Sequence, residues 1–192
     1  MADNPVITAM LELVDSLNKN RINYVMMGGL AVRALAIPRP TNDVDITIDC
    51  SALELESWLK GWDSATIQVP EIYLTGWLDR VADMPLVKLK AHFDKEHAVD
   101  LDIFVCETEF QRSMMSRRIQ AQIDEDQSVW IASTEDLILL KLIANRPRDW
   151  IDIADVLFVQ GSIDETYLER WANLLGVRDR LQKALAKDHR DF

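Results

Sequence analysis

Apolar and polar residues alternate along the chain with two different periods, and together these periods predict a mixture of strands and helices. Strict alternation predicts strands at 44–48, 86–93 and 99–105, and shorter apolar runs predict strands at 24–27, 66–69, 119–123 and 129–132. Apolar residues at helical spacing predict helices at 5–17, 30–37, 52–62, 110–116, 134–144, 148–159, 165–175 and 178–187. Residues 72–81 fit either a helix or an irregular segment, and hairpin connections are expected at 94–97 and 124–127.

The order of these elements predicts how the chain is organised. Strands and helices are mixed up to residue 132, and every element expected from residue 133 onward is a helix. We therefore predict an α/β (α+β) domain with a mixed sheet over residues 1–132, and a C-terminal helical bundle over residues 133–192 packed on it. A chain of 192 residues can bury such a core without disulfide or metal staples.

Charge and hydropathy exclude some classes of function. The chain has 32 Asp and Glu against 21 Lys and Arg, a formal net charge of −11 at pH 7, and such a surface argues against extended binding to DNA or RNA. The nearly apolar stretch 137–144 is too short to span a bilayer. The first residues lack the basic start and apolar run of a secretory signal. We therefore expect no membrane partner and a cytoplasmic location.

The most informative pattern is Met27-Gly28-Gly29 followed, after residues 30–42, by Asp43-Val44-Asp45-Ile46. Glycines between a strand and a helix allow phosphate oxygens to approach the backbone N–H groups of the helix N-terminus, although a glycine pair also serves simple turns. Asp43 and Asp45 are two positions apart on a strand, so both side chains point to one face and can hold divalent cations. Two such cations can align an attacking hydroxyl and neutralise a transferring phosphoryl group.

A third carboxylate is expected on the strand at 99–105. Asp100 and Asp102 lie there among apolar residues and again share one face. A carboxylate in so apolar a run is costly unless it is paired or coordinated, so at least one of the two is a candidate ligand. Periodicity alone leaves the choice between them open.

These residues resemble the signature of the nucleotidyltransferase superfamily typified by polymerase β. That signature is an apolar residue with Gly-Gly or Gly-Ser, then Asp-apolar-Asp/Glu-apolar, and a third aspartate on a later strand. Asp102, followed by Ile103 and Phe104, is more similar to the third aspartate of the family than Asp100 is. The resemblance implies a nucleotidyltransferase fold with a mixed sheet flanked by helices.

Within this superfamily the chain is most similar to the AbiEii-type group, the nucleotidyltransferase-like toxins of type IV toxin–antitoxin systems. In that group a lysine on a helix precedes an Arg-Asp-x-x-Asp-like segment, and Lys141 with residues 148–152 matches this pattern. From the residues alone, Lys141 either serves a triphosphate or extends to solvent from its apolar setting. Asp152 likewise either orients Lys141 or a substrate hydroxyl, or stabilises a helix start.

The resemblance implies the transfer of a nucleoside monophosphate from an NTP such as ATP to an acceptor hydroxyl with two Mg²⁺ ions. The acceptor would be an RNA end such as that of tRNA, a protein or a small molecule, and a cognate antitoxin is an expected partner. The implied catalytic and metal-binding residues are Asp43, Asp45 and Asp102, and the implied nucleotide-binding residues are Gly28, Gly29, Lys141 and Asp152.

Two other functions are consistent with parts of the pattern. A module with the same fold that binds nucleotides without turnover would keep these residues, although the intact carboxylate set weighs against it. A metal-dependent phosphodiesterase or nuclease would also use clustered aspartates, but it does not explain the Gly-Gly pair.

Overall fold

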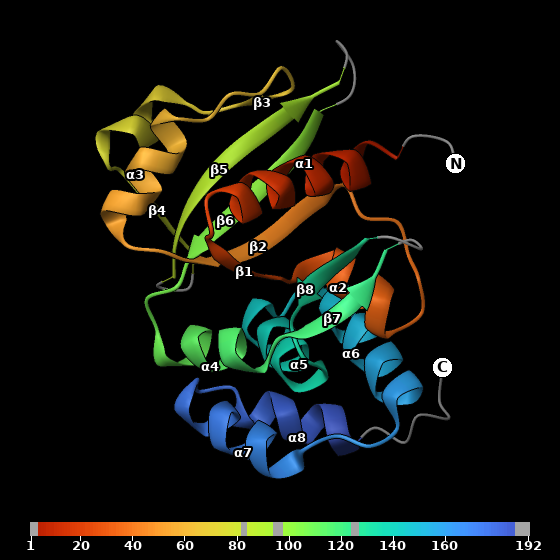
Figure 1. Cartoon of the computed structure of the whole chain (residues 1–192). Coiled ribbons are helices and arrows are strands. Elements are labelled where there is room, and N and C mark those ends of the chain that lie inside the picture. Colours follow the sequence, from red (N-terminus) through yellow and green to blue (C-terminus); the bar gives the residue numbers. More distant parts are fainter. Residues whose placement is uncertain (1–3, 82–83, 94–97, 124–126, 187–192) are drawn as a thin grey trace.

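A mixed sheet runs through the molecule (Figure 1). The computed structural model describes residues 4–81, 84–93, 98–123 and 127–186, and within these ranges the sheet has eight strands in the order β3-β5-β6-β2-β1-β8-β7, with β4 paired to β5. The strands are β1 (Asn23–Met26), β2 (Asp43–Asp49), β3 (Ile67–Gln68), β4 (Asp79–Val81), β5 (Met84–His92), β6 (Ala98–Val105), β7 (Ile119–Gln122) and β8 (Ser128–Ile131). β2 is antiparallel to β1 and parallel to β6, so the sheet is mixed as predicted.

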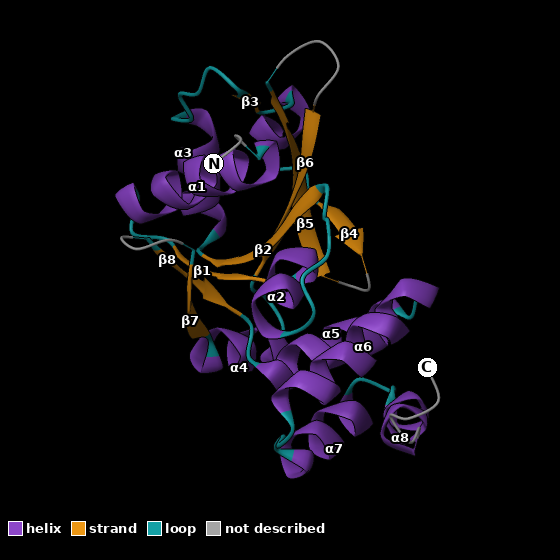
Figure 2. Ribbon diagram, turned by 90° about the vertical axis from the view of Figure 1, so that its right-hand side faces the viewer, coloured by secondary structure: helices purple, strands orange, loops and turns teal. Residues whose placement is uncertain are grey.

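The helices lie in two groups around this sheet. α1 and α3 lie against the part formed by β2, β5 and β6, whereas α4 to α8 gather at the other end of the molecule (Figure 1). α2 stands between the sheet and the α5–α6 pair (Figure 2). The helices are α1 (Pro5–Lys19), α2 (Gly28–Leu35), α3 (Ala52–Lys60), the 3-10 helix η1 (Glu71–Thr75), α4 (Glu109–Arg117), α5 (Thr134–Ala144), α6 (Pro147–Gln160), α7 (Glu165–Leu174) and α8 (Arg178–Ala186).

Several helix starts follow from local side-chain chemistry. The side chain of Asn4 accepts a hydrogen bond from the Val6 N–H, and Pro5 occupies the first turn of α1. Ser51 and Glu54 form a reciprocal capping box at the start of α3. Ser133 caps α5 by accepting from the Asp136 N–H. These caps satisfy backbone donors that have no partner inside the helix, which explains why the helices begin at these positions.

Three elements differ from the sequence prediction. α2 begins at Gly28 rather than at residue 30, because Gly28 adopts a φ of +60° and leads directly from β1 into the helix. The same helix ends at Leu35, with an extended Ala36 two residues before Pro38. Residues 72–81 contain most of η1 and then β4, and the predicted strand at 66–69 shortens to the two residues of β3.

Both predicted hairpins are present as antiparallel strand pairs, β5 with β6 and β7 with β8. Their connections at 94–97 and 124–126, and the end of the last predicted helix at residue 187, lie outside the described residues. After residue 133 the described chain is helical, and α5 and α6 both contact α2. In the described part of the chain, no helix is both long and apolar enough to cross a membrane.

Candidate active site

An acidic wall is built by two neighbouring parallel strands. The register of β2 and β6 places Asp43 beside Asp100 and Asp45 beside Asp102. Because side chains alternate between the two faces of a strand, all four carboxylates belong to the same face, while Val44 and its alternating apolar neighbours are buried on the other. The period-two pattern that predicted a shared face is therefore observed on both strands.

Asp100 and Asp102 differ in their surroundings. The side chain of Asp100 is 62% exposed and its Oδ1 atom lies 2.7 Å from Lys90 Nζ, in a surface ion pair. The Asp102 side chain is 30% exposed, lies 3.7 Å from Lys88 Nζ, and lines the same pocket as Asp45. Asp102 thus lies at the same pocket as Asp45, whereas Asp100 is engaged with Lys90 at the surface, and Asp102 stays the predicted third carboxylate.

The carboxylates of the acidic wall influence each other electrostatically. Burial raises the pKa of the Asp45 carboxyl to about 6, and the charges of Asp43 and Asp102 add to that rise. Burial also raises the pKa of Asp102, and the Lys88 ammonium opposes part of this rise. Within the described residues, no three carboxylate, thiol or imidazole groups are already arranged as a metal centre. The donor type nevertheless fits Mg²⁺, which prefers carboxylate oxygens, and a cation would relieve the repulsion around Asp45.

The two glycines are tied sterically to this acidic wall. A Cβ atom placed on Gly28 would lie 1.9 Å from Asp45 Oδ2, and one placed on Gly29 would lie 2.3 Å from Thr41 Oγ1. That same Thr41 hydroxyl donates a 2.6 Å hydrogen bond to Asp43 Oδ1. Both glycines are therefore required for the close approach of the start of α2 to the two aspartates of β2.

The N-terminus of α2 faces the same region. Met27, its N-cap residue, makes no side-chain capping bond, and the Met27 N–H donates to the backbone oxygen of Asp45 at 2.9 Å. Gly28 and Gly29 each line a pocket beside Asp45. Uncapped N–H groups at a helix N-terminus favour anions, so this turn is suited to a phosphate group.

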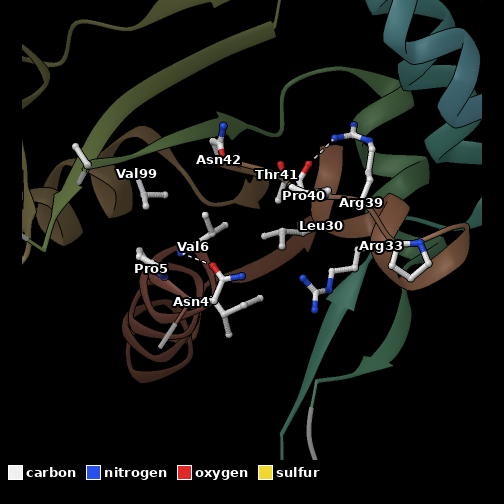
Figure 3. A pocket seen from close by; sticks show the side chains of 13 residues that line it. Asn4, Pro5, Val6, Leu30, Arg33, Arg39, Pro40, Thr41, Asn42 and Val99 are labelled. Carbon is white, nitrogen blue, oxygen red and sulfur yellow. Dashed lines mark hydrogen bonds between the residues drawn. The ribbon is translucent and has the colours of Figure 1, made fainter. Parts of the chain in front are cut away.

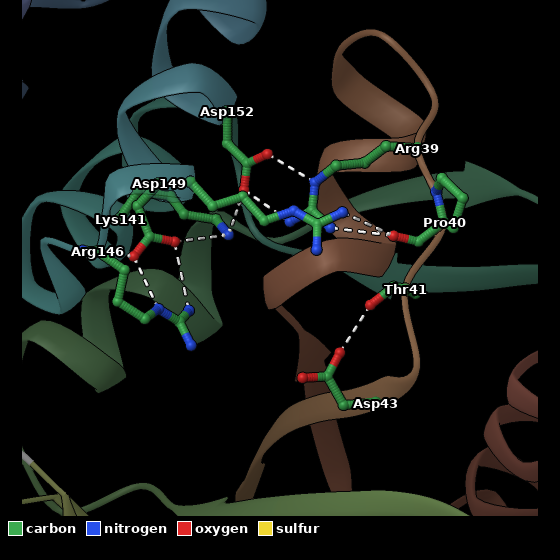
Figure 4. Close-up of polar contacts among 9 residues, drawn as sticks. Arg39, Pro40, Thr41, Asp43, Lys141, Arg146, Asp149 and Asp152 are labelled. Atoms are coloured by element: carbon green, nitrogen blue, oxygen red, sulfur yellow. Dashed lines mark hydrogen bonds and ion pairs between the residues drawn. The ribbon is translucent and has the colours of Figure 1, made fainter.

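A network of ion pairs around two buried carboxylates forms the opposite, basic wall, whose cations are Arg39, Lys141 and Arg146 (Figure 4). Lys141 Nζ on α5 lies 3.1 Å from Asp149 Oδ1 and 2.6 Å from Asp152 Oδ2, both on α6. Arg39 donates two hydrogen bonds of 2.7 Å to Asp152, and Arg146 donates to Asp149 at 2.9 and 3.3 Å. We call Lys141, Asp149 and Asp152 the ionic hub. It joins the segment between α2 and β2 to the C-terminal helices.

Both carboxylates of the ionic hub are held in their charged form. Burial alone would raise the pKa of Asp152, but hydrogen bonds from Arg39 and Lys141 outweigh it and lower the pKa. The same balance lowers the pKa of Asp149, where burial is outweighed by hydrogen bonds from Arg146 and by Lys141. Lys141, Asp149 and Asp152 are each at most 4% exposed, so the hub is part of the protein interior.

Two adjoining pockets lie between the acidic and basic walls. One, of about 370 Å³, is largely apolar and includes Asp102 and Phe104; the other, of about 200 Å³, is polar and includes Asp43. Asp45, Lys141 and Arg146 line both. A larger cavity of about 730 Å³ lies elsewhere, between the start of α1, α2 and residues 38–42 (Figure 3), and its lining contains none of the predicted site residues.

The structure therefore brings together the residues predicted from the sequence, with two additions. Arg39 forms an ion pair with Asp152. Arg146 was not predicted, although it lines both pockets. Arg146 is the N-cap residue of α6 and forms a reciprocal capping box with Asp149, three positions later. This spacing is the only signal in the sequence that could have indicated Arg146, and an arginine is an unusual N-cap residue.

A mixed sheet with paired carboxylates beside a glycine-led helix is the arrangement that the nucleotidyltransferase resemblance predicts. Residues 6–175 match the model of a family described as nucleotidyltransferase of unknown function (DUF6036), and the chain belongs to this family. The match confirms the superfamily predicted from the residues, whereas the narrower AbiEii-type group stays a prediction. A comparison with curated protein sequences gives no match.

Solved structures show the same fold. An antigenic nucleotidyltransferase-like protein from Paracoccidioides brasiliensis is similar with a TM-score of 0.54 and 20% identity, over 94% of this chain and 91% of that chain. ANT(2″)-Ia, in a complex with adenylyl-2″-tobramycin, is similar with a TM-score of 0.52 and 16% identity, over 90% of this chain and 97% of that chain. These likenesses confirm the predicted fold class.

Proposed function

We propose that this protein transfers a nucleoside monophosphate from an NTP such as ATP to an acceptor hydroxyl. The observation that carries the proposal is the contact between the two motifs: Gly28 has room only for a hydrogen atom beside Asp45, and Asp45 is paired in register with Asp102. The turn that we propose to bind phosphate is thereby adjacent to the acidic wall. Membership of a nucleotidyltransferase family supports the same reaction.

In this proposal each wall has a separate task. Asp43, Asp45 and Asp102 would hold two Mg²⁺ ions, which supply charge neutralisation for the transferring phosphoryl group and its leaving pyrophosphate. The N–H groups of Gly28 and Gly29 would bind phosphate oxygens at the start of α2. The cations of the basic wall would balance the remaining negative charge on the triphosphate.

The acceptor classes follow from the superfamily resemblance. An RNA end such as that of tRNA, a protein and a small hydroxylated molecule are all chemically compatible with a nucleophilic hydroxyl. The net charge of −11 disfavours long-range attraction of RNA, so contact with RNA would be limited to its end. The AbiEii-type resemblance adds a toxin role with an antitoxin partner, which predicts that expression arrests growth and that Asp45→Asn restores it.

Label transfer tests the reaction directly. The protein is incubated with Mg²⁺ and each α-³²P NTP, first with total RNA and then with protein lysate or small hydroxylated molecules. The proposal predicts label in one acceptor class, and its loss in the double variant Asp43→Asn plus Asp45→Asn. Asp49→Asn, at the far exposed end of β2, is the matched control and should retain transfer.

Two outcomes would contradict this function. If the double variant transfers label as well as the wild type, the carboxylates are not the reactive site. If calorimetry shows NTP binding while no acceptor class yields pyrophosphate, the protein is a nucleotide-binding module that lacks turnover.

A further inference from the structure

The cations of the basic wall differ in how many of their hydrogen-bond donors remain free to contact a ligand. Lys141 is 4% exposed and its ammonium is held between Asp149 and Asp152. Arg39 uses Nε and Nη2 on Asp152 and donates from Nη1 to the Pro40 carbonyl oxygen at 3.1 Å. Both side chains are therefore committed to contacts within the protein.

Arg146 is at once fixed and accessible. Its Nε and Nη2 atoms donate to Asp149, whose side chain is 2% exposed, while the Arg146 side chain is 67% exposed. No hydrogen bond within the described residues occupies its Nη1 atom. A guanidinium held along one edge by a buried carboxylate presents its other edge in a defined direction, which lowers the entropic cost of binding an oxyanion.

Arg146 also lies where an anion would meet the glycine turn. It lines the apolar pocket together with Gly28 and the polar pocket together with Gly29. Asp45 lines both pockets as well, so a ligand there lies between carboxylates on one side and a guanidinium on the other. This arrangement suits a polyphosphate that is accompanied by divalent cations.

We propose that Arg146 contacts the polyphosphate of the nucleotide, and that Lys141 and Asp149 are positioning residues that hold Arg146 in place. The ligand's identity as a nucleoside triphosphate rests on the proposed function. The role assigned to Lys141 changes accordingly: it neutralises Asp149 and Asp152 inside the protein, and Arg146 makes the contact that the sequence assigned to Lys141.

Calorimetric titration without any acceptor tests the contact. The full chain in Mg²⁺ is titrated with inorganic tripolyphosphate, with α,β-methylene-ATP and with adenosine. Arg146→Ala is expected to weaken tripolyphosphate and the ATP analogue about tenfold or more, and to leave adenosine unaffected, because a lost charged contact acts only on the phosphates. Arg178→Ala is the matched control: it removes the same charge from an exposed ion pair with Glu169 and should bind like the wild type.

Two further variants test the positioning role. Arg146→Lys keeps the charge but cannot form the two-point contact with Asp149, so its affinity should lie between that of Arg146→Ala and the wild type. Asp149→Asn should raise the KM for NTP with a smaller effect on kcat. It should add little to Arg146→Ala in the double variant, because both changes remove the same fixed guanidinium. A merely structural role of Asp149 would give independent, multiplying effects.

The proposal is overturned if the wild type does not bind tripolyphosphate, or if Arg146→Ala binds it with wild-type affinity at an unchanged Tm. It is supported if binding depends on Arg146 even when no acceptor receives label. That last result would separate this inference from the proposed transfer reaction, which would then be wrong.

Discussion

The carboxylate of Asp152 accepts two hydrogen bonds of 2.7 Å from the guanidinium of Arg39, which lies 113 positions earlier in the chain. Lys141 approaches the same carboxylate at 2.6 Å from α5. The fully buried Asp152 carboxylate is thus paired with two cations, Arg39 and Lys141, from segments that are far apart in the chain. Through Arg39, α6 is linked to the segment that leads into Asp43 and the acidic wall.

Removing Arg39 should therefore destabilise the whole fold. Arg39→Ala leaves the Asp152 charge with Lys141 alone, and breaking a buried pair on one side costs about 3 kcal/mol. Urea unfolding measures this loss. Lys60→Ala, in an exposed ion pair with Glu56, should change the free energy of unfolding by less than about 1 kcal/mol. Equal losses for the two variants would show that the Arg39 contact is energetically unimportant.

Gly28→Ala should damage the site by moving Asp45. Its Cβ would lie 1.9 Å from Asp45 Oδ2, in addition to the strain of a φ of +60°. Gly76→Ala is the matched control, because Gly76 has a φ of +84° with nothing within 4 Å of an added Cβ. Both variants should lose about 1 kcal/mol or more of stability from the backbone strain, and only Gly28→Ala should lose label transfer. Retained transfer in Gly28→Ala would mean that Asp45 is not required in this position.

Asp45→Asn should stabilise the protein in the absence of divalent cations. The substitution removes a half-buried charge that is repelled by Asp43 and Asp102 and has no ion pair among the described residues. We expect the free energy of unfolding to rise by about 1 kcal/mol, and Tm by roughly 3 °C. The Tm of Asp45→Asn, measured by thermal unfolding in EDTA, tests this prediction. Asp49→Asn is the control, because it also removes one negative charge from β2. Added Mg²⁺ should raise the Tm of the wild type more than that of Asp45→Asn. A lower Tm for Asp45→Asn than for Asp49→Asn would refute the repulsion.

Tyr167→Phe tests how α7 is attached to the rest of the protein. The Tyr167 hydroxyl donates a 2.6 Å hydrogen bond to the fully buried Asp136 and lies 2.9 Å from Ser113 Oγ. Loss of a donor to a buried carboxylate costs about 2 kcal/mol, which urea unfolding resolves. Tyr73→Phe removes an equivalent bond to Asp79 and should cost less, because the Asp79 carboxylate remains accessible to water. A larger loss in Tyr73→Phe would contradict this explanation.

The acidic wall could be predicted from the sequence because it depends on local periodicity. Alternation on the strands at 44–48 and 99–105 implies which face Asp45 and Asp102 share, whatever the rest of the fold is. The different surroundings of Asp100 and Asp102 depend on the register of β2 with β6 and on the positions of Lys88 and Lys90, which are tertiary facts.

The basic wall could be predicted only in part, because its geometry depends on contacts between segments far apart in the chain. Lys141 and Asp152 were found through a family pattern. That pattern does not tell which cation remains accessible, since the burial of Lys141 and the exposure of Arg146 result from the packing of α5 on α6. The start of α2 differs from the prediction for a similar reason: glycine has a low helix propensity, and close packing against Asp45 and Thr41 outweighs it here.

The ionic hub also has a consequence for biosynthesis. A polypeptide leaves the ribosome from its N-terminus, so β2 and β6 emerge before the hub residues of α5 and α6 exist outside the exit tunnel. Until residue 152 has emerged, Arg39 lacks its carboxylate partner and the nascent sheet presents its aspartates without the facing cations. The cleft is consequently completed only after residue 152 has left the ribosome, later than the two strands that carry its aspartates, and until then the site is not charge-balanced.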